Sequence, residues 1–207
     1  MQKLFLSRCC YLLIFSLLCL IHTSTANAAL SKYVRKHRNI SVTNQQATNV
    51  ARFNHLIEYF SSFSYFKPQH KVNANFIRAL MLAESNADPR ATSNKDAKGL
   101  CQITFPTGKQ AATELAQKNI HFRYVSKRRL LNLRPHDLYS PAINILLTCY
   151  LISKYNYTFQ GKLDLVVAAW NAGEYSITNN RPPQYKETLN LIGKVNGYFI
   201  FFLKNKS

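Results

Sequence analysis

The sequence has little negative charge, with nine Asp and Glu residues against 27 Lys and Arg in 207 residues. The resulting formal net charge of +18 favours a polyanionic partner. Basic residues are densest at positions 32–38 and 127–134. Each of these runs is consistent with a solvated face and with attraction of an anionic substrate, and the sequence leaves both interpretations open.

The sequence also lacks the motifs that usually bind cofactors. It has no Cys/His spacing suited to a metal ion, no glycine-rich phosphate loop and no Ser/His/Asp arrangement. We therefore predict no metal site and no other cofactor. No internal repeat or low-complexity linker divides the chain, which favours a single folded domain.

Residues 1–28 have the pattern of a secretory signal peptide, with cleavage expected before Ala29. The apolar run at 11–21 is shorter than the roughly 20 residues of a membrane span, and a retained anchor is the alternative. A lipid anchor at Cys19 is set aside, because Leu18 precedes it where a small residue is usual. We expect an exported protein in the periplasm or at the cell wall, with no transmembrane span after cleavage.

Cleavage would leave 179 of the 207 residues, enough for one domain with a sizeable core. Because Lys3 and Arg8 leave with the leader, the remaining charge balance would be about +16. Of the five cysteines, only Cys101 and Cys149 would remain, either paired or as small buried residues. Outside the cytoplasm the anionic partners are lipid headgroups and cell-wall peptide carboxylates, and we predict no nucleic acid.

Apolar residues recur at helical spacing over nearly the whole mature chain. Helices are predicted at about residues 45–61, 72–87, 106–117, 141–155 and 163–172, with a last helix from Pro182-Pro183 to the C-terminus. Between them we expect a loose basic lead-in at 29–44, a polar loop at 89–105 and a basic irregular segment at 121–137. No strand is predicted. The pattern indicates a mainly α domain over residues 45–207.

One charged residue, Glu84, lies on an apolar helical stripe. It follows Met81, Leu80 and Ile77 at spacings of three, four and seven residues. Burial disfavours the charged form of a carboxyl group and raises its pKa, which suits a general acid working near neutral pH. The alternative is a glutamate at the end of a helix that is turned towards water.

Glu84 begins a series of motifs that closely resembles the signature of the soluble lytic transglycosylases. The first group is Glu84-Ser85, Asp88-Pro89, Ala91, Ser93, Gly99-Leu100-Cys101-Gln102 and Thr107. The later groups, in the family's order, are Asn144-Ile145, then Ala168-Ala169-Trp170-Asn171-Ala172-Gly173, then Pro182-Pro183, Tyr185, Glu187-Thr188 and Val195. The resemblance spans about residues 72–195, and several motifs at compatible spacings are far more specific than any one of them.

The resemblance implies a single-domain lysozyme-like fold of the goose-type and soluble lytic transglycosylase kind, with an irregular loop after the catalytic helix. Glu84 would be its single catalytic carboxylate. Ser93 and Gln102 would contact the N-acetyl and ring hydroxyl groups of the substrate. Trp170 and Asn171 would line the floor of the cleft.

By the same resemblance, Glu187 would close the far side of the cleft. The binding residues also have structural interpretations, because Ser93 can cap a turn, Gln102 can satisfy loop backbone and Asn171 can end a helix. These alternatives are weaker when all the motifs occur together and in order.

The chain departs from the family pattern at several positions. Trp170 and Leu191 stand where the family usually has tyrosine, although the indole of Trp170 can still donate a hydrogen bond to the acid. The other departures are Asp96, Cys101, Thr104 and Glu174, which replace a common glycine, two methionines and a proline. We expect these changes to affect subsite preference and rate, and to leave the fold unchanged.

The chemistry implied by the resemblance is lytic transglycosylation of peptidoglycan with one carboxylate. Glu84 would protonate the oxygen leaving C1 of N-acetylmuramic acid, and the substrate's acetamido oxygen would stabilise the positive centre. The 6-hydroxyl would then close a 1,6-anhydro ring. Asp88 is assigned a structural task, because Asp is usual before proline at a helix stop.

Two other functions remain open at this point. A goose-type muramidase shares the fold but delivers water and leaves a reducing end. A wall-binding or nucleic-acid-binding protein without activity would keep the fold alone. The sequence also leaves open whether the enzyme serves general wall turnover or opens the wall for a secretion, conjugation or pilus machine.

Overall fold

The computed structural model describes residues 28–205. The predicted signal peptide therefore lies outside the described residues, apart from its last residue. Within residues 28–205, no helix is long and apolar enough to cross a membrane.

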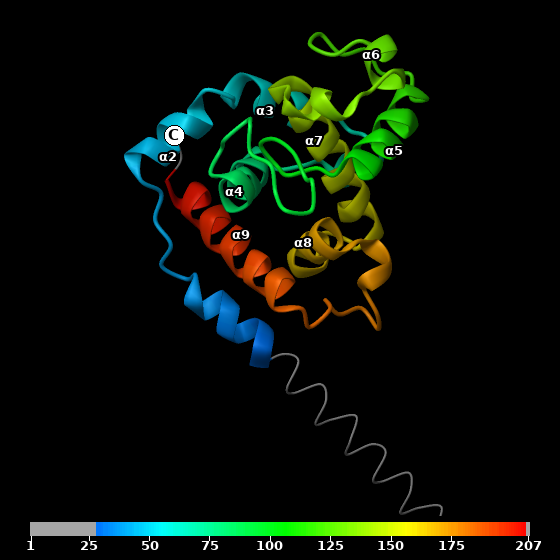
Figure 1. Cartoon of the computed structure of the whole chain (residues 1–207). Coiled ribbons are helices and arrows are strands. Elements are labelled where there is room, and N and C mark those ends of the chain that lie inside the picture. The colour runs from blue at the N-terminus through cyan, green and yellow to red at the C-terminus, as the bar shows by residue number, and fades with distance from the viewer. Residues whose placement is uncertain (1–27, 206–207) are drawn as a thin grey trace, which may run out of the picture.

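The described chain is a bundle of helices around one core (Figure 1). The helices are α2 (Asn44–Ala51), α3 (Asn54–Ser61), α4 (Ala74–Ser85), α5 (Phe105–Ala116), α6 (Lys127–Leu131), α7 (Pro141–Thr158), α8 (Leu163–Ala172) and α9 (Lys186–Lys204). Three short 3-10 helices are η1 (Pro68–His70), η2 (Pro135–Tyr139) and η3 (Glu174–Ser176). Residues 28–36 are also helical. In place of a sheet, the described residues have only isolated β-bridges, in the segments 92–103 and 178–181.

Helix α7 forms the centre of this bundle. Every residue from Ile143 to Ser153 is buried, which is the pattern of a helix that is covered on all sides. Helices α3, α5 and α8 pack against it, and α4 lies alongside α9 (Figure 1). The core thus supports α4 and α8, the two helices that carry the candidate site.

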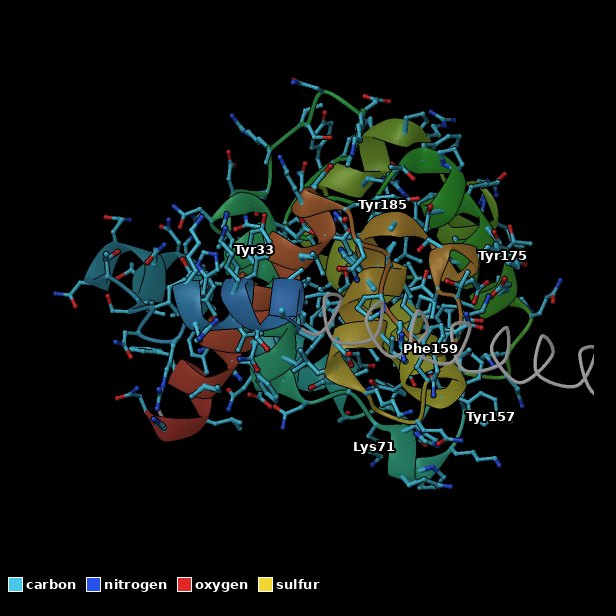
Figure 2. All side chains as sticks on the ribbon, turned by 90° about the horizontal axis from the view of Figure 1, so that it is seen from below. Tyr33, Lys71, Tyr157, Phe159, Tyr175 and Tyr185 are labelled. Carbon is cyan, nitrogen blue, oxygen red and sulfur yellow. The ribbon has the colours of Figure 1, made fainter. Side chains whose placement is uncertain are left out.

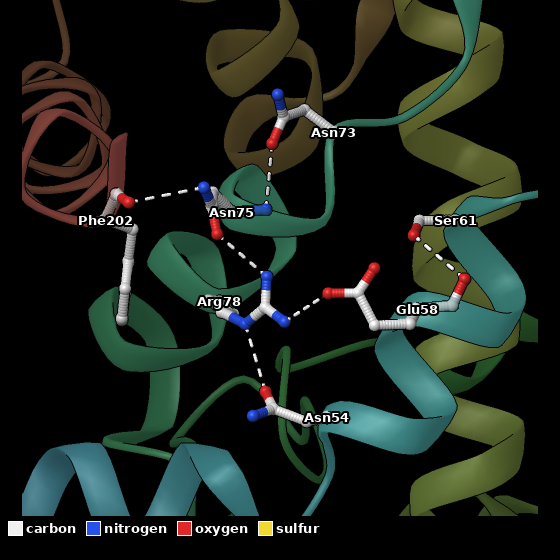
Figure 3. Close-up of polar contacts among 7 residues, drawn as sticks. All are labelled: Asn54, Glu58, Ser61, Asn73, Asn75, Arg78 and Phe202. Atoms are coloured by element: carbon white, nitrogen blue, oxygen red, sulfur yellow. Dashed lines mark hydrogen bonds and ion pairs between the residues drawn. The ribbon is translucent and has the colours of Figure 1, made fainter. Parts of the chain in front are cut away.

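A buried arginine fixes the first half of α4 (Figure 3). The Arg78 guanidinium donates to Asn54 Oδ1 at 3.0 Å and to Asn75 Oδ1 at 2.8 Å, and it forms an ion pair with Glu58. The Asn75 amide also donates to the carbonyl of Phe202 in α9 at 3.3 Å. These bonds tie α4 to α3 on one side and to α9 on the other.

The loop after α4 is attached to α7 by a buried asparagine. Asn144 Nδ2 donates to the carbonyls of Lys98 and Leu138 at 3.0 and 2.8 Å, and its Oδ1 accepts from the Cys101 amide at 3.0 Å. Gly99 lies directly against this contact with a φ of 76°, and a Cβ there would lie 2.4 Å from the Leu138 carbonyl oxygen. The position therefore requires glycine.

Several predicted helix limits differ from the structure. The predicted helix at 45–61 is two helices, because the chain bends at Arg52 and Phe53. The predicted helix at 72–87 ends at Ser85, since Asn86 and Ala87 both adopt positive φ values before Pro89 is reached. The segment at 121–137 was predicted to be irregular, but it contains α6 and the start of η2.

The lead-in at 29–44 is also not loose as predicted. Its helical part packs closely on α9, where a Cβ on Gly193 would lie 2.5 Å from the Tyr33 carbonyl oxygen. The His37 ring nitrogen Nε2 lies 3.0 Å from Asn190 Oδ1 in the same contact. Small residues on α9 thus allow the lead-in helix to approach closely.

The two cysteines of the described chain are unpaired and buried. Burial raises the pKa of the Cys101 thiol to about 12 and also raises the pKa of Cys149. Of the two roles that the sequence left open, the structure places both residues as small apolar core groups.

Candidate active site

Glu84 lies in the last turn of α4, and its carboxyl group meets α8. The indole Nε1 of Trp170 donates a hydrogen bond to Glu84 Oε1 at 2.8 Å. Ser85, the next residue, donates from Oγ to the Leu100 carbonyl at 2.6 Å and attaches the helix end to the following loop. The carboxyl group is therefore held between a helix, a loop and an indole ring.

Burial raises the pKa of Glu84 to about 7, from an ordinary value of 4.5. The hydrogen bond from Trp170 and the charge of Lys194 lower this pKa, and the charge of Glu187 raises it further. The effect of desolvation is the largest, as the position of Glu84 on an apolar stripe predicted. A pKa near 7 populates both the acid and the carboxylate at neutral pH.

A cavity of about 390 Å³ lies beside this carboxyl group. It is lined by all six site residues predicted from the sequence, namely Glu84, Ser93, Gln102, Trp170, Asn171 and Glu187. They come from α4, the loop at 89–104, α8 and the start of α9. The fold thus brings together residues that are separated by up to 103 positions in the sequence.

Ser93 and Gln102 also stabilise the loop that forms one wall of the cavity. Ser93 Oγ accepts from the amides of Lys95 and Ala97 at 3.2 and 3.1 Å. Gln102 Nε2 donates to the carbonyls of Ala91 and Gly99 at 3.1 and 2.9 Å. The structural roles considered for these two residues are therefore present, and they position both side chains at the cavity wall.

Asn171 and Trp170 occupy the last turn of α8. Thr188 Oγ1 donates to Asn171 Oδ1 at 2.6 Å, which fixes the amide against the first turn of α9. Gly173 ends the helix with a φ of 85° and itself lines the cavity. The end of α8 therefore contributes an oriented amide and an oriented indole to the same wall.

Glu187 is not free on the far side of the cavity. Lys95 Nζ donates to Glu187 Oε2 at 2.7 Å, and both side chains are largely exposed, at 73% and 64%. The hydrogen bond from Lys95 lowers the pKa of Glu187. Lys95 could not be predicted as a site residue, because no local sequence pattern links residues 92 positions apart.

Three further residues of the cavity wall had no site role predicted from the sequence, although Thr104 and Thr107 belong to the motif region. Tyr155 of α7 lines the cavity together with Thr104 and Thr107 from the start of α5. Two tyrosines lie close in sequence to cavity residues, Tyr175 at 94% exposure and Tyr185 at 61% (Figure 2). From the sequence alone, such a tyrosine can be recognised as a site candidate only when its neighbours are already known to line a site.

Asp88, the other acid near Glu84 in the sequence, does not line the cavity. Its Oδ1 accepts from the Arg90 amide at 2.8 Å, in the turn that follows α4. The cavity therefore has two carboxyl groups in its wall, a partly buried one with a raised pKa and an exposed one in an ion pair. Within residues 28–205, no group of three or more His, Cys, Asp or Glu side chains is placed to hold a metal ion.

Comparison with protein-family models matched residues 62–191, more than half of the chain, to the transglycosylase SLT domain. The structure is similar to the 70 kDa soluble lytic transglycosylase of Escherichia coli, with 18% identity and a TM-score of 0.59 over 73% of this chain and 24% of that one. An inactive mutant of the Pseudomonas aeruginosa lytic transglycosylase Slt gave 20% identity and a TM-score of 0.52 over 76% of this chain and 24% of that one.

A complex of the 70 kDa soluble lytic transglycosylase with bulgecin A gave 18% identity and a TM-score of 0.54, over 90% of this chain and 35% of that one. The chain thus spans about a quarter to a third of the length of these structures. Comparison with curated proteins gave no match. These similarities confirm the predicted mainly α, lysozyme-like fold.

Proposed function

The chain belongs to the transglycosylase SLT domain family, and from this membership we propose that it is a peptidoglycan lytic transglycosylase. It cleaves the β-1,4 bond between N-acetylmuramic acid and N-acetylglucosamine and leaves a 1,6-anhydro end. The observation that carries this proposal is the environment of Glu84. Its carboxyl group has a pKa of about 7 beside a cavity that is also lined by the hydrogen-bonding side chains of Ser93, Gln102 and Asn171.

In the first half of the reaction, Glu84 acts as the general acid. Its proton moves to the glycosidic oxygen, and the bond from that oxygen to C1 of N-acetylmuramic acid breaks. The carbonyl oxygen of the substrate's own acetamido group stabilises the positive charge at C1. A second catalytic carboxylate is therefore unnecessary, which agrees with the ion-paired state of Glu187.

In the second half, Glu84 is a carboxylate and acts as the general base. It takes the proton of the 6-hydroxyl group while that oxygen bonds to C1 and displaces the acetamido oxygen. The product is the 1,6-anhydro sugar, and Glu84 recovers the proton that it lost. A pKa near 7 suits a group that must give and take one proton in each cycle.

The remaining cavity residues bind and orient the glycan. Ser93 and Gln102 contact the N-acetyl and ring hydroxyl groups, and Asn171 contributes to the floor of the cleft. Trp170 orients the acid through its indole, and Glu187 binds at the far side. Support for these roles comes from the common cavity and from the hydrogen bonds that fix each side chain.

Export is part of the proposal, because peptidoglycan lies outside the cytoplasm. We assign residues 1–28 as a signal peptide and place the mature protein in the periplasm or at the wall. An N-terminal sequence of the exported protein that begins at Met1 would contradict this assignment.

Mass spectrometry of the products released from purified peptidoglycan tests the reaction. We expect muropeptides with 1,6-anhydro ends, whose mass is lower by one water than that of the hydrolysis product. Reducing ends in their place would identify a muramidase. Binding to sacculi without any product, in wild type as in Glu84→Gln, would identify a wall-binding protein.

A further inference from the structure

A second hollow, separate from the cleft, is lined mainly by basic residues. It has a volume of about 910 Å³ and lies between α6 and η2. Its lining residues are Ser126, Arg128, Arg129, Asn132, Arg134, His136 and Asp137. Three arginines and one aspartate thus lie in the wall of this basic hollow.

The single acid of the basic hollow is used to hold its frame together. Asp137 is only 4% exposed, and its two oxygens accept from Arg129 Nη2 at 2.5 Å and from the Arg134 amide at 2.8 Å. Ser126 Oγ accepts from the Arg129 amide, and Asn132 Nδ2 donates to the Arg128 carbonyl. These bonds fix the backbone from which the other basic side chains project.

Arg128 and Arg134 are left for an external anion. Both are exposed, and within residues 28–205 neither forms an ion pair with a carboxylate. A guanidinium group is a planar fork that binds a carboxylate through two parallel hydrogen bonds. Two such forks on a fixed backbone form a site for an oxyanion, and the solvated basic face is the simpler alternative.

The basic hollow is connected to the cleft through two short contacts. Thr107 lines the cleft, and Lys109 in the same helix donates to the carbonyl of Leu131, next to the hollow, at 2.8 Å. At the other side, the hydroxyl groups of Thr92 and Tyr139 are 2.7 Å apart and join the cleft loop to η2. The elements that form the cleft wall therefore also support the hollow.

We propose that the basic hollow binds carboxylates of the short peptides carried by the glycan. This inference rests on the proposed function, because a glycan strand bound in the cleft carries the peptides that would bind in the hollow. An extended peptide spans about 3.3–3.6 Å per residue, so a few residues cover the width of a helix. A tethered carboxylate has a high effective concentration, and a weak site is sufficient.

The test compares two double variants that remove the same charge from different places. Arg128→Gln with Arg134→Gln alters the hollow, and Lys32→Gln with Lys36→Gln alters the exposed lead-in helix. Each is measured on sacculi with intact peptides and on the same glycan after an amidase has removed the peptides. Cosedimentation gives binding to the sacculi, and release of anhydro products gives KM and kcat on both substrates. If the double variant unfolds at a lower temperature than wild type, Arg128→Gln alone is measured in its place, because it removes none of the hydrogen bonds that hold the hollow together.

We expect the hollow variant to weaken binding and raise KM about 3- to 10-fold on peptide-bearing sacculi, with a smaller change on peptide-free glycan. The lead-in variant should match wild type on both substrates. Equal losses on the two substrates, or equal losses in the two variants, would overturn the inference and leave only a general charge effect.

Two further outcomes separate this inference from its alternatives. Arg128- and Arg134-dependent binding to phosphatidylglycerol vesicles, without such dependence on sacculi, would assign the hollow to lipid phosphate and contradict the peptide. Absence of anhydro products from peptide-bearing sacculi with wild type would contradict the proposed function instead. Cosedimentation with these sacculi that depends on Arg128 and Arg134 would still support the carboxylate site in that case.

Discussion

The two walls of the cleft place the same functional group in opposite environments. On the inner wall, Glu84 is partly buried against Trp170, and desolvation raises its pKa to about 7. On the outer wall, Glu187 is exposed and paired with Lys95, which lowers its pKa. At neutral pH only Glu84 therefore has a proton to donate. The contrast shows that the surroundings of a carboxyl group, and not its presence in the cleft, decide its pKa, and Glu84 is therefore the acid that we propose for catalysis.

The two walls also differ in how firmly they are held. The inner wall belongs to α4 and α8, and both helices pack against α7 and α9. The outer wall consists of a loop and the first turn of α9, joined by an ion pair that salt can screen. We therefore expect large effects from changes on the inner wall and small effects from changes on the outer one.

The largest effect is expected from Glu84→Gln. Glutamine has nearly the same shape but can neither donate nor recover the proton, so both halves of the reaction fail. Each proton transfer contributes typically 10²- to 10⁴-fold, and we expect a loss of at least about 10⁴-fold in kcat. Release of anhydro-muropeptides is the measurement.

Glu187→Gln and Asp88→Asn are the matched controls, because each also removes one carboxylate. We expect Glu187→Gln to raise KM more than it lowers kcat, and Asp88→Asn to retain most activity. Substantial turnover by Glu84→Gln, or a loss confined to Asp88→Asn, would contradict the assignment of Glu84 as the catalytic acid.

The next effect concerns stability rather than rate. The pKa of Glu84 is about 7 in the folded state, and its ordinary value of 4.5 stands for the unfolded chain. The folded protein therefore binds the Glu84 proton more tightly than the unfolded chain does. The stabilisation of the fold by this proton is complete below pH 4.5 and is lost as the pH rises to about 7. We expect Glu84→Gln to gain up to about 3 kcal/mol in unfolding free energy over wild type above pH 7. Urea unfolding at pH 4 and pH 8 measures the difference, and a gain at pH 4 alone would contradict a raised pKa.

Trp170→Phe should have an intermediate effect. The indole hydrogen bond lowers the pKa of Glu84, so its loss should raise that pKa further. The alkaline limb of the kcat/KM profile, where the acid deprotonates, should move to higher pH. We expect about a 10-fold loss of rate as well, because one charge-assisted hydrogen bond orients the carboxyl group. An alkaline limb that moves to lower pH would show that the indole does not stabilise the carboxylate.

Lys95→Ala should have the smallest effect. The ion pair with Glu187 is exposed, and such pairs contribute little to stability. The pKa of Glu187 should rise towards its ordinary value, and kcat/KM should change less than about 5-fold. This small difference from wild type should fade at high salt. A loss as large as that of Glu84→Gln would place the outer wall in the chemistry.

The inner wall was more predictable from the sequence than the outer wall. The stripe through Ile77, Leu80 and Met81 indicated the burial of Glu84, and Gly173 marked the end of α8. These are local patterns, in which burial and helix ends depend on neighbouring residues. The positions of the binding residues followed from the family resemblance and not from such patterns.

The ion pair between Lys95 and Glu187 could not be predicted, because it depends on how a loop and a distant helix pack. The break near Phe53 was missed for a related reason. The spacing of apolar residues continues from α2 into α3 across the bend, so the periodicity of the two helices resembles that of one helix. The spacing of apolar residues indicates which side of a segment is buried, but it is a poorer guide to the position at which the backbone turns.

A direct test of the contrast between the walls is a carboxyl titration by NMR of protein labelled with ¹³C at the glutamate side chains. The chain has glutamate at positions 58, 84, 114, 174 and 187, and spectra of Glu84→Gln and Glu187→Gln assign the two resonances of interest. We predict that Glu84 titrates at about 7 and that Glu187 titrates below 4.5. Titration of Glu84 at or below 4.5, or of Glu187 above Glu84, would contradict the assignment of Glu84 as the proton donor.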